Sequence, residues 1–377
     1  MDTNQKKFGI YVFLSTFSRN LIEVFIPVIL FKFGFDLKSI LFYYFIANAV
    51  SLIISYPSVY LSQKFNYKIL SIIGIVAFLI LQILLNFMTN NIWYLFSIAV
   101  LYAVYRRGYW IARRYYNLRV IKNNDISTTY SIISIINQIG VIVSAYIGSI
   151  ILDYISLNIL TIIAIVLFTA SIVPLYFLTF KKDTTNKKIE LCKTLRQIPK
   201  NNIYLFGSYE LLNVVKFLIP LYIFIYVKNT YQTIGIVNLI TNLSLIVFTY
   251  LFGKTLDKSN NNFLTISVIL TVIVFTLKVN SVGYALLLIS VFEGFVTKMY
   301  ELSINKEFYT LSKKFEYTNY NLTYEIIQNS FRTIVTFIFV IFNLKLKTMI
   351  YITLLCISLS IFLKKTDDKI IQQKAQN

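Results

Sequence analysis

The first apolar stretch of the chain, at residues 8–33, reads FGIYVFLSTFSRNLIEVFIPVILFKF. It exceeds the roughly 20 apolar residues that a helix needs to cross the hydrocarbon core of a bilayer, and it is longer than the apolar region of a signal peptide. Arg19 and Glu23 lie near its middle. Because a charge at that depth costs several kcal/mol, such residues usually face a cavity and serve a function. The stretch therefore predicts a retained membrane helix that takes part in the protein's activity.

Comparable stretches fill the rest of the 377-residue chain, of which 57% is hydrophobic. Twelve spanning helices would use about 240 residues, which leaves only short loops and no separate soluble domain. We therefore expect an all-α integral membrane protein with about twelve transmembrane helices. Their expected positions are residues 8–33, 39–61, 69–88, 92–114, 127–151, 157–180, 203–227, 232–253, 263–279, 281–304, 320–343 and 347–363.

Basic residues set the orientation of this predicted bundle. The formal net charge is +20, and most Lys and Arg lie in segments that share one side of the membrane with the N-terminus. The positive-inside rule then predicts a multi-pass protein of the cell membrane, expected to be bacterial, with both termini cytoplasmic. Since the basic segments lie between apolar ones, they favour contact with anionic lipid headgroups over nucleic acid.

The longest loop divides the chain into two halves. We expect a six-helix bundle at residues 1–180, a basic cytoplasmic linker at 181–202, a second bundle at 203–363 and a cytoplasmic tail at 364–377. The first helix of each half carries a polar residue, a charge and a proline at i, i+3 and i+7: Asn20, Glu23 and Pro27, then Asn213, Lys216 and Pro220. Matching halves of the same orientation predict a parallel repeat, which is a common transporter construction.

Two motifs point to a family. After the eighth helix comes Gly-x-x-x-Asp-Lys, and after the second helix Gln63 replaces the acid while the basic residue is kept. The fifth helix repeats small residues. The residues concerned are Gly253, Asp257, Lys258, Gln63 and Lys64 in the loops, and Gly140, Ser144, Ala145, Gly148 and Ser149 in the helix.

In these motifs the chain resembles the major facilitator superfamily, and the fifth-helix pattern is similar to that of its drug/proton antiporters. The resemblance implies two pseudo-repeated six-helix bundles that rock about a central site. The loop motif would help to gate the cytoplasmic side, although Gln63 cannot carry the charge of an aspartate. For the fifth-helix motif, ordinary close packing of helices is the alternative.

Charged residues at mid-depth are the candidates for a site. Glu23 is the main candidate for a carboxylate that binds and releases a proton, since the first helix lines the cavity in the family; the alternative is a structural ion pair with Arg19. Lys216 occupies the equivalent position in the second half and is expected to approach Glu23. The other candidates are Glu293 and Arg332 among the charges, and Asn20, Asn213, Asn137, Gln138 and Gln328 among the amides.

Arg106 and Arg107 fall in the inner half of the fourth predicted helix. The simpler interpretation is that they mark the cytoplasmic boundary and extend to lipid phosphates. The alternative is that one of them faces the cavity. Acids and bases at mid-depth are nearly balanced, so the sequence does not indicate the charge of a substrate.

Several kinds of chemistry are disfavoured by composition. The chain has no histidine and two cysteines, which argues against His-based catalysis, a disulfide framework and a metal site. It also lacks a nucleotide-binding Gly-Lys loop. We expect no enzyme activity and no cofactor, and a monomeric secondary transporter that moves a small molecule by alternating access, with proton-coupled efflux as the preferred direction. The alternatives are a proton-coupled uptake symporter and a non-transporting sensor or assembly partner on the same fold.

Overall fold

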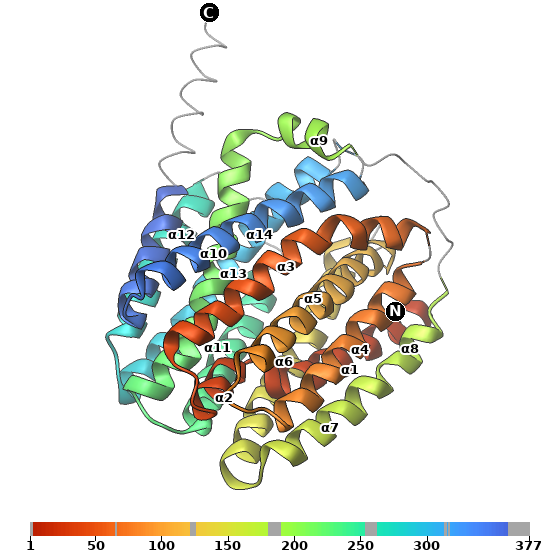
Figure 1. Ribbon diagram of the computed structural model, residues 1–377. Helices are drawn as coiled ribbons and strands as arrows, with labels where there is room; N and C mark the ends of the chain where they lie inside the picture. The colour runs from red at the N-terminus through yellow and green to blue at the C-terminus, as the bar shows by residue number, and fades with distance from the viewer. Residues whose placement is uncertain are drawn as a thin grey trace, which may run out of the picture.

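The computed structural model describes residues 3–64, 66–120, 126–179, 190–252, 262–312, 315 and 317–360, and it contains helices but no strand within them (Figure 1). The helices are α1 (Thr3–Glu23), α2 (Ile26–Lys32), α3 (Leu37–Lys64), α4 (Tyr67–Asn86), α5 (Ile92–Val120), α6 (Ile126–Tyr154), α7 (Leu157–Ala170), α8 (Ile172–Tyr176), α9 (Leu191–Gln197), α10 (Lys200–Tyr226), α11 (Tyr231–Phe252), α12 (Asn262–Val279), α13 (Gly283–Ser312) and α14 (Tyr317–Phe342). A last helix, without a label, spans Leu346–Ser360.

These helices form the twelve predicted spans. By length and composition, eight spans are long and apolar enough to cross a membrane, with α1 and α2 counted together, and α12 and Leu346–Ser360 provide two shorter apolar ones. The helices α5 and α13 supply the remaining two, at 29 and 30 residues, and are less apolar because of the charges they carry. The prediction of about twelve transmembrane helices is therefore confirmed, while α9 lies in the predicted linker.

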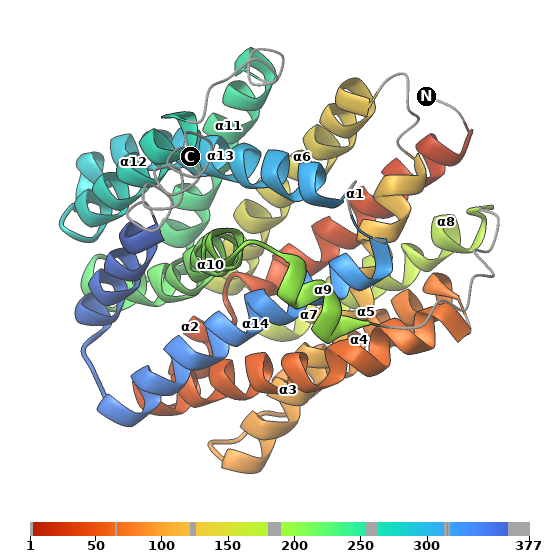
Figure 2. The same ribbon diagram turned by 90° about the horizontal axis from the view of Figure 1, so that it is seen from above.

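The two halves meet along two pairs of helices. The helix α3 packs along α14, and α6 packs along α11, as the two views of the ribbon also show for α3 and α14 (Figures 1 and 2). One side of the molecule contains the start of α1 and the helix α9, and we call it the linker side. The side of the turns that follow α2 and α10 is the opposite side.

On the opposite side, contacts join the two halves. The Asp153 carboxylate at the end of α6 accepts the backbone N–H groups of Tyr231 and Gln232 at the start of α11, at 3.1 and 2.6 Å. The Lys32 ammonium of α2 lies 4.1 Å from the centre of the Tyr231 ring. The described residues thus tie the halves together where α2, α6, α10 and α11 meet.

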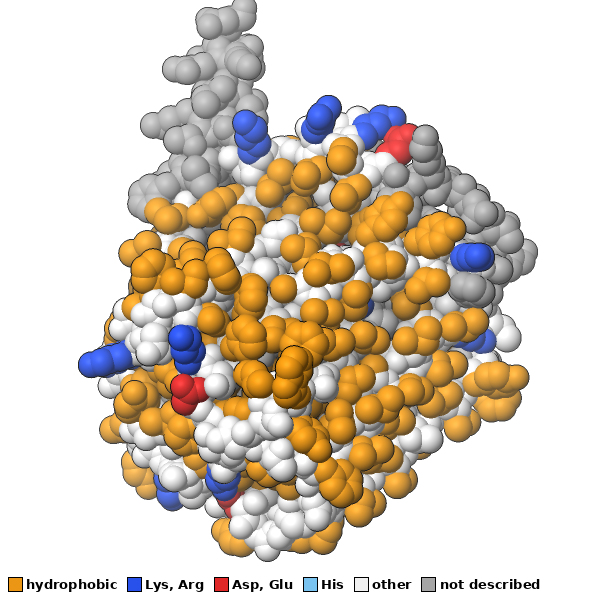
Figure 3. Space-filling model, viewed as in Figure 1, with side chains coloured by type: hydrophobic (Ala, Val, Ile, Leu, Met, Phe, Trp, Pro, Cys, Tyr) orange, Lys and Arg blue, Asp and Glu red, His pale blue; other side chains and the backbone are white. Residues whose placement is uncertain are grey.

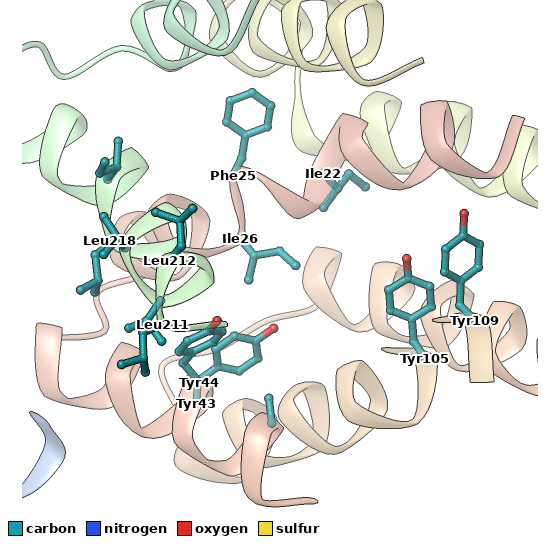
Figure 4. Packing of buried hydrophobic residues seen from close by; sticks show 14 of the residues in the cluster. Ile22, Phe25, Ile26, Tyr43, Tyr44, Tyr105, Tyr109, Leu211, Leu212 and Leu218 are labelled. Carbon is teal, nitrogen blue, oxygen red and sulfur yellow. The ribbon is translucent and has the colours of Figure 1, made fainter. Parts of the chain in front are cut away.

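The first span is broken at its middle. Pro27 has no N–H to donate to the carbonyl of Glu23, four residues earlier, and its ring disfavours a continuous helix there. Accordingly α1 ends at Glu23 and α2 begins at Ile26. In Figure 4, Phe25 and Ile26 lie at this break, between Leu211 on α10 and Tyr105 on α5. The break places the end of α1 at the centre of the molecule.

The outer surface is apolar. Figure 3 shows hydrophobic side chains over most of the visible face, with Lys and Arg side chains at its upper edge and at a few places on its left, lower-left and right margins. Large side chains such as Trp93 and Tyr284 are 73% and 88% exposed. In a multi-pass membrane protein such side chains face the lipid tails or the interface with water, so this apolar surface is the lipid-facing exterior of the bundle.

Candidate functional site

A cavity of about 610 Å³ lies between the two halves. It is lined from the first half by α1, α2, α3, α5 and α6 and from the second by α10 to α14. Asn117 and Asn305 line it in the linker-side parts of α5 and α13. The volume is in the range of small-molecule sites in proteins, and the lining reaches toward the linker side.

Glu23 lies in this cavity at the break after α1. Its carboxylate pairs with Arg19 Nε at 2.9 Å and accepts a hydrogen bond from Tyr102 Oη at 2.7 Å. The Arg19 guanidinium also stacks on the rings of Tyr109 and Trp110, at 5.5 and 5.2 Å from their centres. Glu23 is therefore a half-buried carboxylate with one cation and one hydroxyl as partners.

Lys216 also lines the cavity, in α10. Its side chain is exposed within it, and it makes no ion pair or hydrogen bond with any residue in the described part of the chain. No ion pair joins Glu23 and Lys216 among the described residues; the partners of the Glu23 carboxylate are Arg19 and Tyr102.

Three further pairs line the second half. The Glu293 carboxylate pairs with Lys278 and accepts the Thr241 hydroxyl at 3.0 Å. Glu210 pairs with Arg332 Nε at 3.3 Å and accepts the Asn213 amide at 2.6 Å. The third pair joins Lys298 Nζ and Glu301 at 3.1 Å. In each pair a carboxylate is matched to one cation.

One ion-pair cluster crosses between the halves. Glu325 of α14, which is fully buried, pairs with both Arg107 and Arg114 of α5. Arg114 also donates to Asn321 Oδ1 at 3.2 Å. One carboxylate from the second half is thus shared by two guanidinium groups from the first.

The positions of Arg106 and Arg107 contradict the simpler interpretation of the sequence, in which both mark the cytoplasmic boundary. Both are buried and line the cavity instead of extending to lipid phosphates. Arg106 donates to Asn48 Oδ1 at 2.9 Å, and Arg113, further along the helix, donates to Tyr109 and Asn137 at 2.8 and 2.7 Å. Helix α5 turns these arginines inward, where aromatic rings and amides cover them.

The predicted amides are divided among several environments. Asn20, Asn213 and Gln328 line the cavity, and Asn20 donates to the backbone carbonyl of Thr16 at 2.9 Å. Asn137 accepts from Arg113 and Thr16 in the wall of the first half. Gln138 is half-buried on α6 and does not line the cavity.

The small residues of the fifth-helix motif face two neighbours. A Cβ on Gly148 would lie 2.5 Å from the carbonyl oxygen of Leu21, so α6 and α1 approach closely there. A Cβ on Gly235 of α11 would collide with the Ser149 side chain. Gly140, Ser144 and Ala145 are buried in the same helix. Of the loop motif, Gln63 and Lys64 end α3, while Gly253, Asp257 and Lys258 lie outside the described residues.

Sequence reasoning gave no role to Lys278 or Glu210. Lys278 is one residue from the end of its helix, where a lysine is typical of an interface, yet it is 3% exposed. Glu210 lies more than two turns before Pro220, and its pairing with Arg332 depends on the rotation of α10 and α14. The sequence does carry one signal for polar residues in α14: Glu325, Gln328 and Arg332 are spaced at i, i+3 and i+7, which puts them on one face of the helix. Among the described residues, no group of three His, Cys, Asp or Glu could hold a metal ion.

The cavity between two matched halves, with paired charges in its wall, defines a membrane transporter. The sequence model of the Major Facilitator Superfamily matches residues 8–300, and the chain belongs to this family of secondary transporters, which are not enzymes. No curated protein matches the chain. Among solved structures, the chain is similar to a mutant of the nucleoside transporter NupG, with a TM-score of 0.71 and 13% identity over 96% of this chain and 98% of that one. At that identity the likeness shows the fold.

Proposed function

We propose that this protein is a proton-coupled secondary transporter that works by alternating access, with Glu23 as the proton-binding group. The observation that carries this proposal is the position of Glu23 at the end of a broken helix inside the cavity. Discontinuous membrane helices commonly form the substrate and ion sites of transporters. Glu23 lies at such a break, and its carboxylate lines the cavity, where water can reach it.

The partners of Glu23 support a change of state on protonation. Ionised Glu23 forms an ion pair with Arg19 and accepts a hydrogen bond from Tyr102. A protonated carboxyl no longer neutralises Arg19, so the guanidinium becomes available to the cavity. Proton binding would therefore alter the charge that a substrate meets, which is the requirement for coupling.

Two directions remain as proposals. Export in exchange for protons is supported by the close packing of α6 on α1 at Gly148, in the motif that resembles antiporters. Uptake together with protons is supported by the release of Arg19 on protonation of Glu23, since an added positive charge favours simultaneous binding of a proton and an anionic group. NupG is described as a nucleoside transporter, so we include a nucleoside among the test compounds.

The test uses purified protein in liposomes that contain a pH-sensitive dye. We expect a substrate-evoked proton movement from a panel of uridine, uridine 5′-monophosphate, citrate and tetraphenylphosphonium. Its sign separates antiport from symport. The movement should disappear in Glu23→Gln and persist in Glu190→Gln, where the exposed carboxylate pairs with Lys193 at 2.9 Å on the linker. Unchanged proton movement in Glu23→Gln would rule out Glu23, and transport without proton movement would rule out coupling.

A further inference from the structure

The cavity wall carries more positive than negative charge. Among the residues that the structure describes, seven cations line it: Arg19, Arg106, Arg107, Arg114, Lys216, Lys278 and Arg332. Four carboxylates line it: Glu23, Glu210, Glu293 and Glu301. With the direct partners Lys298 and Glu325 included, eight cations face five carboxylates, an excess of three. The near balance inferred from the sequence is replaced by a cationic cavity.

Every carboxylate that the described residues place in this wall has a cationic partner. Each of the four that line the cavity has a cation of its own, and Glu325 is shared by Arg107 and Arg114. Two cations, Arg106 and Lys216, have no carboxylate partner in the described part of the chain. Arg106 is held by a neutral amide oxygen of Asn48, and the Lys216 ammonium makes no described pair.

The two unmatched cations come from opposite walls. Arg106 is on α5 and Lys216 on α10, so one belongs to each half. Arg106 donates to Asn48 of α3, and one turn earlier on that helix Tyr44 stacks on Phe217, the residue after Lys216, at 3.9 Å between ring centres, so the two cations lie near the same part of the cavity. The Glu210 carboxylate in this wall is already paired with Arg332. Like charges on opposite walls of one cavity repel, and an anion between them removes that repulsion.

We propose that the transported substrate is an anion with a carboxylate or phosphate group, which binds between Arg106 and Lys216. This inference rests on the proposed transport function. A guanidinium and an ammonium together match such a group, since the first offers a planar fork of donors and the second a point charge. The amides of Asn213 and Asn238 and the ring of Trp110 line the same space and would contact the rest of the molecule.

The anion would also connect the halves mechanically. Each half contributes one of its two cations, so the occupied site stabilises a state in which the walls are close. Protonation of Glu23 frees Arg19 and adds to the positive potential. The proposal therefore favours the uptake branch, in which proton and anion bind together.

The chain offers a built-in reporter for this charge. It has two tryptophans: Trp110 lines the cavity, and Trp93 is 73% exposed on the outer surface. In a Trp93→Phe protein in neutral detergent, the fluorescence of Trp110 can be quenched with iodide, caesium or neutral acrylamide. We expect iodide to quench several-fold better than caesium, since a cationic cavity concentrates anions.

Substitution then assigns the effect. Lys216→Gln and Arg106→Gln should each lower the iodide quenching constant about fivefold, the effect of one charge at roughly 8 Å in a partly hydrated site. Acrylamide quenching should stay unchanged, which shows that the cavity is intact. Lys193→Gln, whose side chain is 66% exposed on the linker, is the matched control. Because Lys216 makes no ion pair or hydrogen bond among the described residues, its variant keeps the test valid if Arg106→Gln fails to fold.

Competition tests binding itself. In the Trp93→Phe protein that retains Lys216, citrate and inorganic phosphate should suppress the iodide quenching of Trp110. This suppression should be stronger than that by sodium chloride of equal ionic strength. Equal suppression by chloride would mean a diffuse positive field without an anion site and would overturn the proposal. Caesium quenching as strong as that of iodide would also overturn it. Neither readout requires transport, so the anion site and the transport function can fail separately.

Discussion

Neutralising Glu325 is expected to destabilise the contact between the halves. The Glu325 and Arg107 side chains are 1% and 2% exposed, so their charges have almost no access to water. In Glu325→Gln the amide still accepts one hydrogen bond, but Arg107 is left as a buried charge. Breaking a buried pair in this way costs about 3–5 kcal/mol. Arg114 is 27% exposed and can be hydrated, so we place the expected loss near the lower end, about 3 kcal/mol.

The assay is thermal and denaturant unfolding of the purified protein in detergent. A loss of about 3 kcal/mol corresponds to an equilibrium shift of more than a hundredfold. The matched change Glu190→Gln breaks an exposed pair and should cost less than about 1 kcal/mol. The double variant Glu325→Gln with Arg107→Gln should recover part of the stability, because the uncompensated charge is gone. Equal stability of Glu325→Gln and the wild type, or no recovery in the double variant, would refute the reasoning.

Two further predictions concern packing and capping. Gly148→Ala should destabilise the protein by about 1–3 kcal/mol, because its Cβ would lie 2.5 Å from the Leu21 carbonyl oxygen. The control is Gly140→Ala, whose Cβ would be 3.4 Å from its nearest neighbour. This control variant should be tolerated in the same unfolding assay. Asp36 accepts the Ser39 N–H at 2.9 Å at the start of α3, and hydrogen bonds from Ser39 lower the pKa of Asp36. Asp36→Ala should lower the free energy of unfolding by about 1 kcal/mol at neutral pH. The difference in stability from the wild type should shrink as the pH falls below about 4, because the Asp36 carboxylate is then protonated and no longer caps the helix as an anion. A constant difference across that pH range would contradict this prediction.

The positions of the spans could be predicted because they depend on length and hydrophobicity. The predicted helix at residues 92–114 illustrates both the success and its limit. Its start agrees with that of α5, Ile92–Val120, but its predicted end comes too early, because the arginines resemble a membrane boundary. In sequence, a charge near a helix end is typical of an interface residue, whereas a polar cavity lets the same residue lie inside the protein.

The pairing of the charges could not be predicted for a related reason. Lys278 pairs with Glu293 of the next helix, and Glu325 pairs with arginines of the other half. Spacing along one helix predicts only local pairs, such as Arg19 with Glu23. The pairs between helices depend on the rotation of each helix about its axis, which weakly amphipathic helices do not reveal. This is also why the cation excess became apparent only once each carboxylate could be assigned to its partner.

Corresponding positions in the two halves carry opposite charges, Glu23 in the first and Lys216 in the second. Glu23 and Lys216 each lie four residues before a proline, so the proline leaves the backbone carbonyl of the charged residue without its helical donor. In the first half the helix breaks there, and in the second it continues from Lys200 to Tyr226. The acid at the break has a cation and a hydroxyl as partners, while the base in the continuous helix has none among the described residues. A break in the helix suits a group that changes charge, and a continuous helix suits a fixed charge that holds a ligand. On the proposed mechanism, the first half therefore responds to the proton, the second half holds the anion, and the cavity between them couples the two.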